Sequence, residues 1–86
     1  MVMNKNLSQA IGSRLRKLRL KTQLSQEEFG DMVDADRTYI SKIENGTKNL
    51  TICKLCSICE KMGITLHDFF NDKSFKGKTF SEKEED

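Results

Sequence analysis

The sequence predicts a single all-α domain of five helices, and three observations support this fold class. The 86 residues include no proline, the apolar residues recur with the 3.6-residue period of a helix, and Ser, Thr or Asp precedes most of these periodic segments, as N-cap residues do. A chain of this length forms one core. We therefore expect a domain at residues 8–71, a flexible arm at residues 1–7 and a flexible charged tail at residues 72–86.

The first helix is expected at residues 8–22. Ile11, Leu15 and Leu18 fall on one stripe of it, as the core-facing side of an amphipathic helix requires. Gly12 lowers the helix propensity of its first turns. We interpret this glycine as a point of close packing.

The second helix is expected at residues 25–32. Ser25 and Glu28 have the spacing of a capping box, in which each side chain accepts a hydrogen bond from the other residue's backbone amide. Phe29 and Met32 are then expected to be buried.

A third helix is expected at residues 37–45, directly after Asp36, which is a strong N-cap type. Ile40 and Ile43 lie three residues apart and therefore share one face. The three residues 33–35 would join it to the preceding helix. A connection of this length is typical of a helix-turn-helix, in which the second helix projects from the body of the domain.

The outward face of the third helix has the chemistry of base recognition. Arginine and lysine favour guanine, and serine and threonine can bond to either donors or acceptors in the major groove. We predict base contacts from four residues: Arg37, Thr38, Ser41 and Lys42. For Arg37 the alternative is an ion pair with Asp34 or Asp36.

Side chains around this helix suit contacts with phosphate. We assign this role to Gln26, Tyr39, Lys48 and Asn49. Gln26 stands beside the free amides that open the second helix, which attract anions, although an unengaged surface position is the alternative. Tyr39 either packs in the core or places its hydroxyl on a phosphate. Lys48 and Asn49 follow the third helix, where they would lie beside the DNA backbone and position the protein on it.

The charge distribution supports this interpretation. The net charge is only +2, but residues 1–24 carry six basic residues and no acid, residues 25–36 carry five acids, and residues 37–54 are basic again. Basic blocks on both sides of the recognition helix are the electrostatic pattern of a nucleic-acid surface. The alternative is that they are ordinary solvated helix faces.

A fourth helix is expected at residues 51–62, closed by Gly63. Cys53, Cys56 and Cys59 recur in it at every third residue, a spacing that invites a metal or iron–sulfur interpretation. In a helix, however, such residues rotate by about 300° from one to the next and converge only loosely. We expect them to fill space as small hydrophobes, without a metal or cofactor, and leave any redox role open.

The short fifth helix is expected at residues 66–71, with Thr65 and Asp68 at the spacing of a capping box. Its region carries more apolar side chains than so short an element needs in a monomer: Ile64, Leu66, Phe69 and Phe70. We assign them to a dimer interface, and the alternative is that they close the domain's own core. A mixture of the two roles is favoured, with at least one of the two phenylalanines at the interface.

Two motifs, Ser25–Gly30 and Tyr39–Gly46, resemble those of phage repressor/Cro-type helix-turn-helix regulators. The resemblance extends over residues 11–70, and residues 36–41 and 49–51 look most like small controller proteins of restriction–modification systems. It implies a lambda-repressor-like domain with the helix-turn-helix at its second and third helices, a dimer interface near the fifth helix, and a structural ion pair between Arg19 and Glu44.

Two positions depart from the pattern of these regulators, which usually have glycine in the turn and at the end of the first helix. This chain has Asp34 and Gln23 there. Aspartate tolerates the left-handed conformation better than most residues, so Asp34 is compatible with the turn.

We therefore expect a cytoplasmic, sequence-specific transcriptional regulator that binds double-stranded DNA as a homodimer on a near-palindromic operator. The resemblance favours an autoregulatory controller of a restriction–modification system. The alternatives are a phage- or plasmid-type repressor or an antitoxin, and a protein-interaction module that does not read DNA. No small-molecule ligand is expected, and no phosphate loop or catalytic Ser/His/Asp arrangement indicates an enzyme. No apolar run is long enough to span a membrane.

Overall fold

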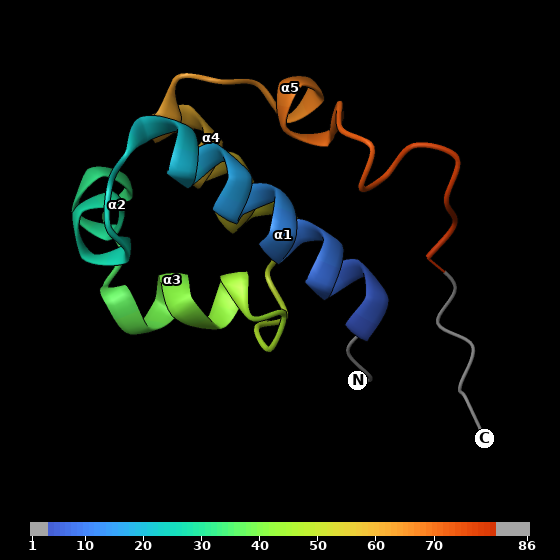
Figure 1. Cartoon of the computed structure of the whole chain (residues 1–86), viewed down its shortest axis with the longest axis horizontal. Coiled ribbons are helices and arrows are strands. Elements are labelled where there is room, and N and C mark those ends of the chain that lie inside the picture. The colour runs from blue at the N-terminus through green and yellow to red at the C-terminus, as the bar shows by residue number, and fades with distance from the viewer. Residues whose placement is uncertain (1–3, 81–86) are drawn as a thin grey trace.

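The computed structural model describes residues 4–80, and they form five helices in the expected order. Their bounds are α1 (Lys5–Thr22), α2 (Gln26–Val33), α3 (Arg37–Glu44), α4 (Ile52–Met62) and α5 (Leu66–Phe70). In Figure 1, α1 runs diagonally through the molecule, with α4 behind it, α2 and α3 toward one end and α5 above. The all-α fold is confirmed. None of the described helices is long and apolar enough to cross a membrane.

Each helix begins at a residue whose side chain accepts a hydrogen bond from an amide three residues later. These N-caps are Asn4, Ser25, Asp36, Thr51 and Thr65. Both expected capping boxes are present, at α2 and α5. The first helix was predicted to begin at residue 8, but Asn4 caps it and α1 starts at Lys5. Residues 5–7 therefore belong to the helix and not to the arm.

The ends of α1 and α2 adopt the left-handed conformation without glycine. Gln23 and Asp34 both have φ of 63°, and the backbone amide of each donates to a carbonyl of the preceding turn. The turn begins at Asp34 instead of residue 33, because Val33 completes α2 and is buried. Met32 consequently faces solvent with 39% exposure, so its predicted burial is wrong.

All five helices contribute to one core. Its fully buried members are Leu15, Phe29, Val33, Ile40, Ile43, Leu55, Ile58, Cys59 and Phe69. Phe69 was expected at a dimer interface, but it has 0% exposure and closes the core of its own domain. The other three apolar side chains of that region are half-buried and keep part of their surface available.

The three cysteines separate around α4 as the helical rotation requires. Cys59 lies in the core, where burial raises the pKa of its thiol to about 11, while Cys53 and Cys56 are exposed. Cys59 thus fills space as a small hydrophobe. Within residues 4–80, no group of three or more His, Cys, Asp or Glu side chains is arranged to hold a metal ion.

Arg14 joins α1 to the C-terminal end of α5. Its Nε donates to the carbonyl of Phe69 at 2.7 Å, and its Nη2 donates to the carbonyl of Asp68 at 2.8 Å. Asp72 adds ion pairs with Arg14 at 3.4 Å and Lys17 at 3.0 Å. The first bond satisfies a carbonyl at the end of α5, and the second adds to the bond that the carbonyl of Asp68 accepts from the amide of Asn71. The sequence pattern placed Arg14 outside the apolar stripe and so missed this role.

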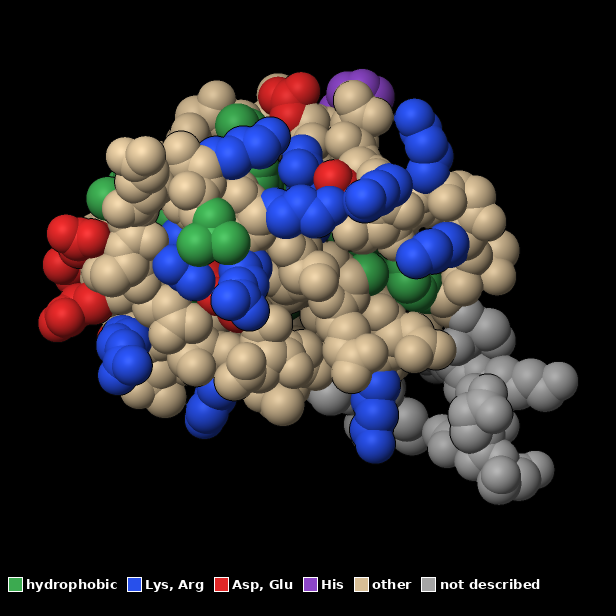
Figure 2. Space-filling model, in the orientation of Figure 1, with side chains coloured by type: hydrophobic (Ala, Val, Ile, Leu, Met, Phe, Trp, Pro, Cys, Tyr) green, Lys and Arg blue, Asp and Glu red, His purple; other side chains and the backbone are tan. Residues whose placement is uncertain are grey.

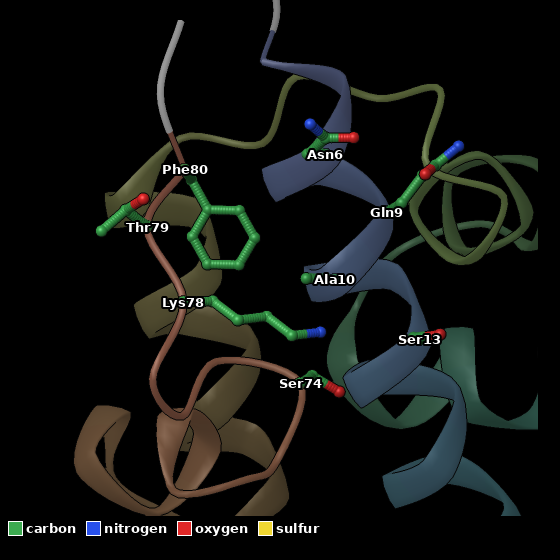
Figure 3. A pocket seen from close by; sticks show the side chains of 8 residues that line it. All are labelled: Asn6, Gln9, Ala10, Ser13, Ser74, Lys78, Thr79 and Phe80. Carbon is green, nitrogen blue, oxygen red and sulfur yellow. The ribbon is translucent and has the colours of Figure 1, made fainter.

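The described part of the expected tail folds back on the domain. The ring of Phe75 lies 4.9 Å from that of Phe70 and 6.2 Å from that of Phe80, measured between centroids. The amide group of Asn4 donates to the carbonyl of Phe80 at 2.9 Å. In Figure 3, Lys78 and Phe80 point toward the first turns of α1 across an open hollow. Residues 1–3 and 81–86 of the expected arm and tail lie outside the described residues.

Gly12 is the point where α1 meets the end of α3. A Cβ atom there would collide with the carbonyl oxygen of Ile43 and would lie 2.9 Å from that of Glu44. Both obstacles are backbone atoms of a helix, so neither can move aside as a flexible side chain would. The close packing expected at Gly12 is therefore present.

The first prediction concerns this contact. Gly12→Ala should lower the free energy of unfolding by about 1–3 kcal/mol, the usual cost of overpacking, despite the better helix propensity of alanine. Urea denaturation followed by circular dichroism measures the change. Ser13→Ala, at an exposed neighbouring position of α1, is the control and should be near neutral. A Gly12→Ala variant as stable as the wild type would contradict the close contact.

The second prediction concerns acid stability. The hydroxyl and amide of Ser74 donate to Asp72 at 2.6 and 3.0 Å, and with Lys17 they hold the pKa of this carboxyl well below its usual range. The resulting stabilisation is complete above the unfolded-state pKa of about 3.9 and is lost as the pH falls below it.

Urea denaturation of the wild type and Asp72→Asn from pH 7 to 2.5 measures this effect. The difference between their unfolding free energies should stay constant down to about pH 5 and shrink below about pH 4. A difference that stayed the same to pH 2.5 would contradict the assignment.

Candidate nucleic-acid interface

One face of α3 is buried and the other carries polar side chains. Ile40 and Ile43 point into the core. The four side chains predicted to contact bases lie on the remaining surface: Arg37, Thr38 and Lys42 are exposed, and Ser41 is half-buried. The structure therefore brings the predicted reading set together on about one and a half turns of a single helix.

A buried ion pair holds the C-terminal end of α3 against α1. Arg19 donates from Nε to Oε2 of Glu44 at 2.7 Å and from Nη2 to Oε1 at 3.0 Å. Its Nη1 donates to the carbonyl of Leu24 at 2.9 Å. The two charged side chains are only 10% and 3% exposed, and the bonds to Glu44 raise the pKa of the guanidinium. Two parallel bonds of this kind fix the angle between the helices as well as their distance.

Gln26, a predicted phosphate contact, supports this ion pair. Its Nε2 donates to Oε1 of Glu44 at 3.1 Å, and the side chain is half-buried. The second amide hydrogen remains at the N-terminal end of α2, where an anion would be favoured. The structural bond was missed because it joins residues from different helices that no local pattern relates.

Tyr39 packs against the core from its half-buried position on α3. The ammonium group of Lys48 lies 5.1 Å from the centre of its ring, and that of Lys54 lies 5.4 Å from it. Asn49 is exposed in the same α3–α4 loop as Lys48. Lys54 was not among the predicted phosphate contacts, although it is the third residue of α4 and lies just after this loop.

The acidic side chains at one end of the molecule lie apart from most of the basic ones, and others lie at the top and among the basic side chains in Figure 2. Figure 2 shows acidic side chains gathered at the left, around α2, and basic side chains projecting below α3 and across α1. The carboxylate of Asp36 accepts from the amide of Tyr39 at 2.8 Å. In the described part of the chain, Arg37 forms no ion pair with Asp34 or Asp36, so the alternative role considered for it is not realised there.

Comparison with known proteins agrees with this geometry. The profile of a family described as a helix-turn-helix domain matches residues 12–74. Control protein C.MunI from Mycoplasma sp. is 50% identical over 62 residues, which cover 71% of this chain and 84% of that protein. Control protein C.BamHI from Bacillus amyloliquefaciens is 34% identical over 70 residues, covering 80% and 86% of the two chains.

Among solved structures, the restriction-modification controller protein C.AhdI from Aeromonas hydrophila matches with a TM-score of 0.67 at 28% identity. The match covers 73% of this chain and 91% of that one. The chain belongs to the restriction–modification controller family of helix-turn-helix regulators. The family and the fold expected from the sequence are thereby confirmed, and the helix-turn-helix of this controller protein is formed by α2 and α3.

The third prediction separates the structural role of Gln26 from any role in DNA binding. Gln26→Ala removes a hydrogen bond to a charged, nearly buried carboxylate, and we expect a loss of about 1–2 kcal/mol in unfolding free energy. Thermal or urea denaturation without DNA measures it. Glu27→Ala, one residue away and exposed, is the matched control. Equal stabilities of the two variants would show that the bond to Glu44 contributes nothing to the fold.

Proposed function

We propose that this controller protein binds DNA as a homodimer and reads a near-palindromic operator with α3. The observation that carries the proposal is the exposed polar face of α3, held at a defined angle by the buried Arg19–Glu44 pair. In helix-turn-helix proteins the second helix lies in the major groove. Two copies would present α3 to half-sites about 34–36 Å apart, one turn of the duplex.

In this proposal the side chains of α3 divide between reading and positioning. Arg37, Thr38, Ser41 and Lys42 contact base edges. Gln26, Tyr39, Lys48 and Asn49 contact the phosphate backbone from the flanks of α3, which sets the register without reading the sequence.

A surface beside α5 is the proposed dimer interface. Ile64, Leu66 and Phe70 are half-buried there, and a shallow hollow lined by Leu66, Phe70 and their neighbours opens next to them. Burying this apolar surface against a second copy would remove it from water. Arg14 fixes α5 to α1, so an interface at α5 would also set the distance between the two recognition helices.

The regulatory role follows from the relatives. C.MunI and C.BamHI are named as control proteins, and C.AhdI as a restriction–modification controller. We propose that this protein regulates its own gene and those of a restriction–modification system, in the cytoplasm and without a small-molecule effector. These relatives favour it over a phage- or plasmid-type repressor or an antitoxin. The charged and polar face of α3 disfavours an interaction module that does not read DNA, because charged residues are depleted at the core of protein–protein interfaces.

Selection of the purified protein against a random duplex pool at physiological salt tests the proposal. We expect enrichment of an inverted repeat whose half-sites are about one helical turn apart. Sedimentation of the complex should show two protein chains for each duplex. Weak, salt-sensitive binding without any enriched sequence would contradict the proposal and favour the interaction module.

The fourth prediction concerns the reading set. Arg37→Ala should weaken binding to the selected operator by about 1–3 kcal/mol and relax the preference at one or two base positions. Repeating the selection with the variant measures both effects. Lys21→Ala, which removes an exposed charge from α1, is the control and should keep the wild-type preference. An unchanged preference in Arg37→Ala would contradict a base contact.

A further inference from the structure

Two lysines from different segments converge on one aromatic ring. Lys48 belongs to the α3–α4 loop and Lys54 to the first turn of α4, and their ammonium groups lie 5.1 and 5.4 Å from the ring centroid of Tyr39. All three side chains are half-buried. Because both distances end at the same ring centroid, the two ammonium groups lie no more than 10.5 Å apart.

These two charges are not neutralised by the protein. Among residues 4–80, neither lysine has a carboxylate within ion-pair distance. Two acids close to Tyr39 in sequence are already engaged: Asp36 accepts from its amide, and Glu44 accepts from Arg19. An anion bound beside the ring would be attracted by both charges.

The ring of Tyr39 explains how both lysine side chains can be held at this position without an acidic partner. A cation is attracted to the face of an aromatic ring within about 6 Å of its centre. The ring itself is fixed because it packs against the core, and burial raises the pKa of its hydroxyl, so the group stays neutral. Resting on this fixed surface, the lysine side chains lose conformational freedom before any ligand binds, which lowers the cost of binding.

The position of Tyr39, Lys48 and Lys54 beside α3 indicates which anion they bind. Tyr39 follows Thr38 on α3, so a duplex whose major groove receives α3 would carry its backbone past the loop and the start of α4. The amides of the first turn of α4 add a partial positive charge on the same side.

We propose that Lys48 and Lys54 form a phosphate clamp for the DNA backbone, with Tyr39 as the residue that positions both ammonium groups. The proposal rests on the proposed function and adds to it a phosphate contact, Lys54, and a role for the ring of Tyr39 that is separate from its hydroxyl. The clamp links the recognition helix, the loop and α4 at one point of the backbone.

The salt dependence of operator binding tests the clamp. Lys54→Gln removes one charge at a phosphate, so the slope of log affinity against log salt should become shallower by about 1, equally for operator and unrelated duplex. Lys61→Gln is the matched control, since it removes an exposed charge from the last turn of the same helix. Its slope should equal that of the wild type.

Two substitutions at Tyr39 test the positioning role. Tyr39→Phe keeps the ring and removes a neutral hydroxyl, which releases no counterion, so the slope should be retained. Tyr39→Leu removes the ring and should make the slope shallower. In the Tyr39→Leu background, Lys54→Gln should then have a smaller effect than in the wild type.

The outcomes are distinguishable from a failure of the proposed function. If the wild type binds its selected operator but Lys54→Gln behaves like Lys61→Gln, the clamp is overturned and the DNA-binding function stands. If Lys54→Gln has its expected effect but Tyr39→Leu, folded by circular dichroism, keeps the wild-type slope, the positioning role is overturned. If the wild type binds no duplex, both proposals fail.

Discussion

The buried ion pair between Arg19 and Glu44 is the constraint on which the recognition surface depends. Removing two charges from water is costly, and the cost is offset only where geometry is good and the remaining donors and acceptors are bonded. Here Leu24 and Gln26 supply those further bonds, and Gly12 allows the backbones to meet next to the pair. The polar face of α3 points outward because Ile40 and Ile43 are buried on the opposite face. The two parallel bonds of the pair add a directional constraint on how the end of α3 meets α1.

The same arrangement leaves the basic side chains of the interface available. Glu44 is neutralised by Arg19, and Asp36 is occupied as an N-cap. The other acids that precede α3 gather around α2, away from the lower edge of the molecule in Figure 2. Arg37 and Lys48 therefore have no ion pair within the described chain. A net charge of only +2 thus coexists with a surface that is suited to an anionic backbone.

The sequence predicted what local chemistry determines. Caps such as Ser25 and Asp36 have patterns of a few residues, and they placed the helices almost correctly. Features that depend on tertiary contacts could not be predicted from such local patterns. Arg14 bonds to carbonyls more than fifty positions away, and Phe69 fills a core whose size only the assembled helices define. The end of α2 shows how small a difference matters. The helix includes Val33, one residue beyond its predicted end, and Val33 is buried while Met32, about 100° away around the helix, is exposed.

The central claim is that the Arg19–Glu44 pair orients α3 for reading DNA. Arg19→Lys tests it most directly, because lysine keeps the charge but cannot form the two parallel bonds. Affinity for the selected operator and the amide NMR shifts of α3 should be measured where the variant is folded, with exposed Arg16→Lys as control. The account predicts shifted α3 amides and weaker operator binding in Arg19→Lys alone. Unchanged shifts and affinity in a folded Arg19→Lys protein would contradict it.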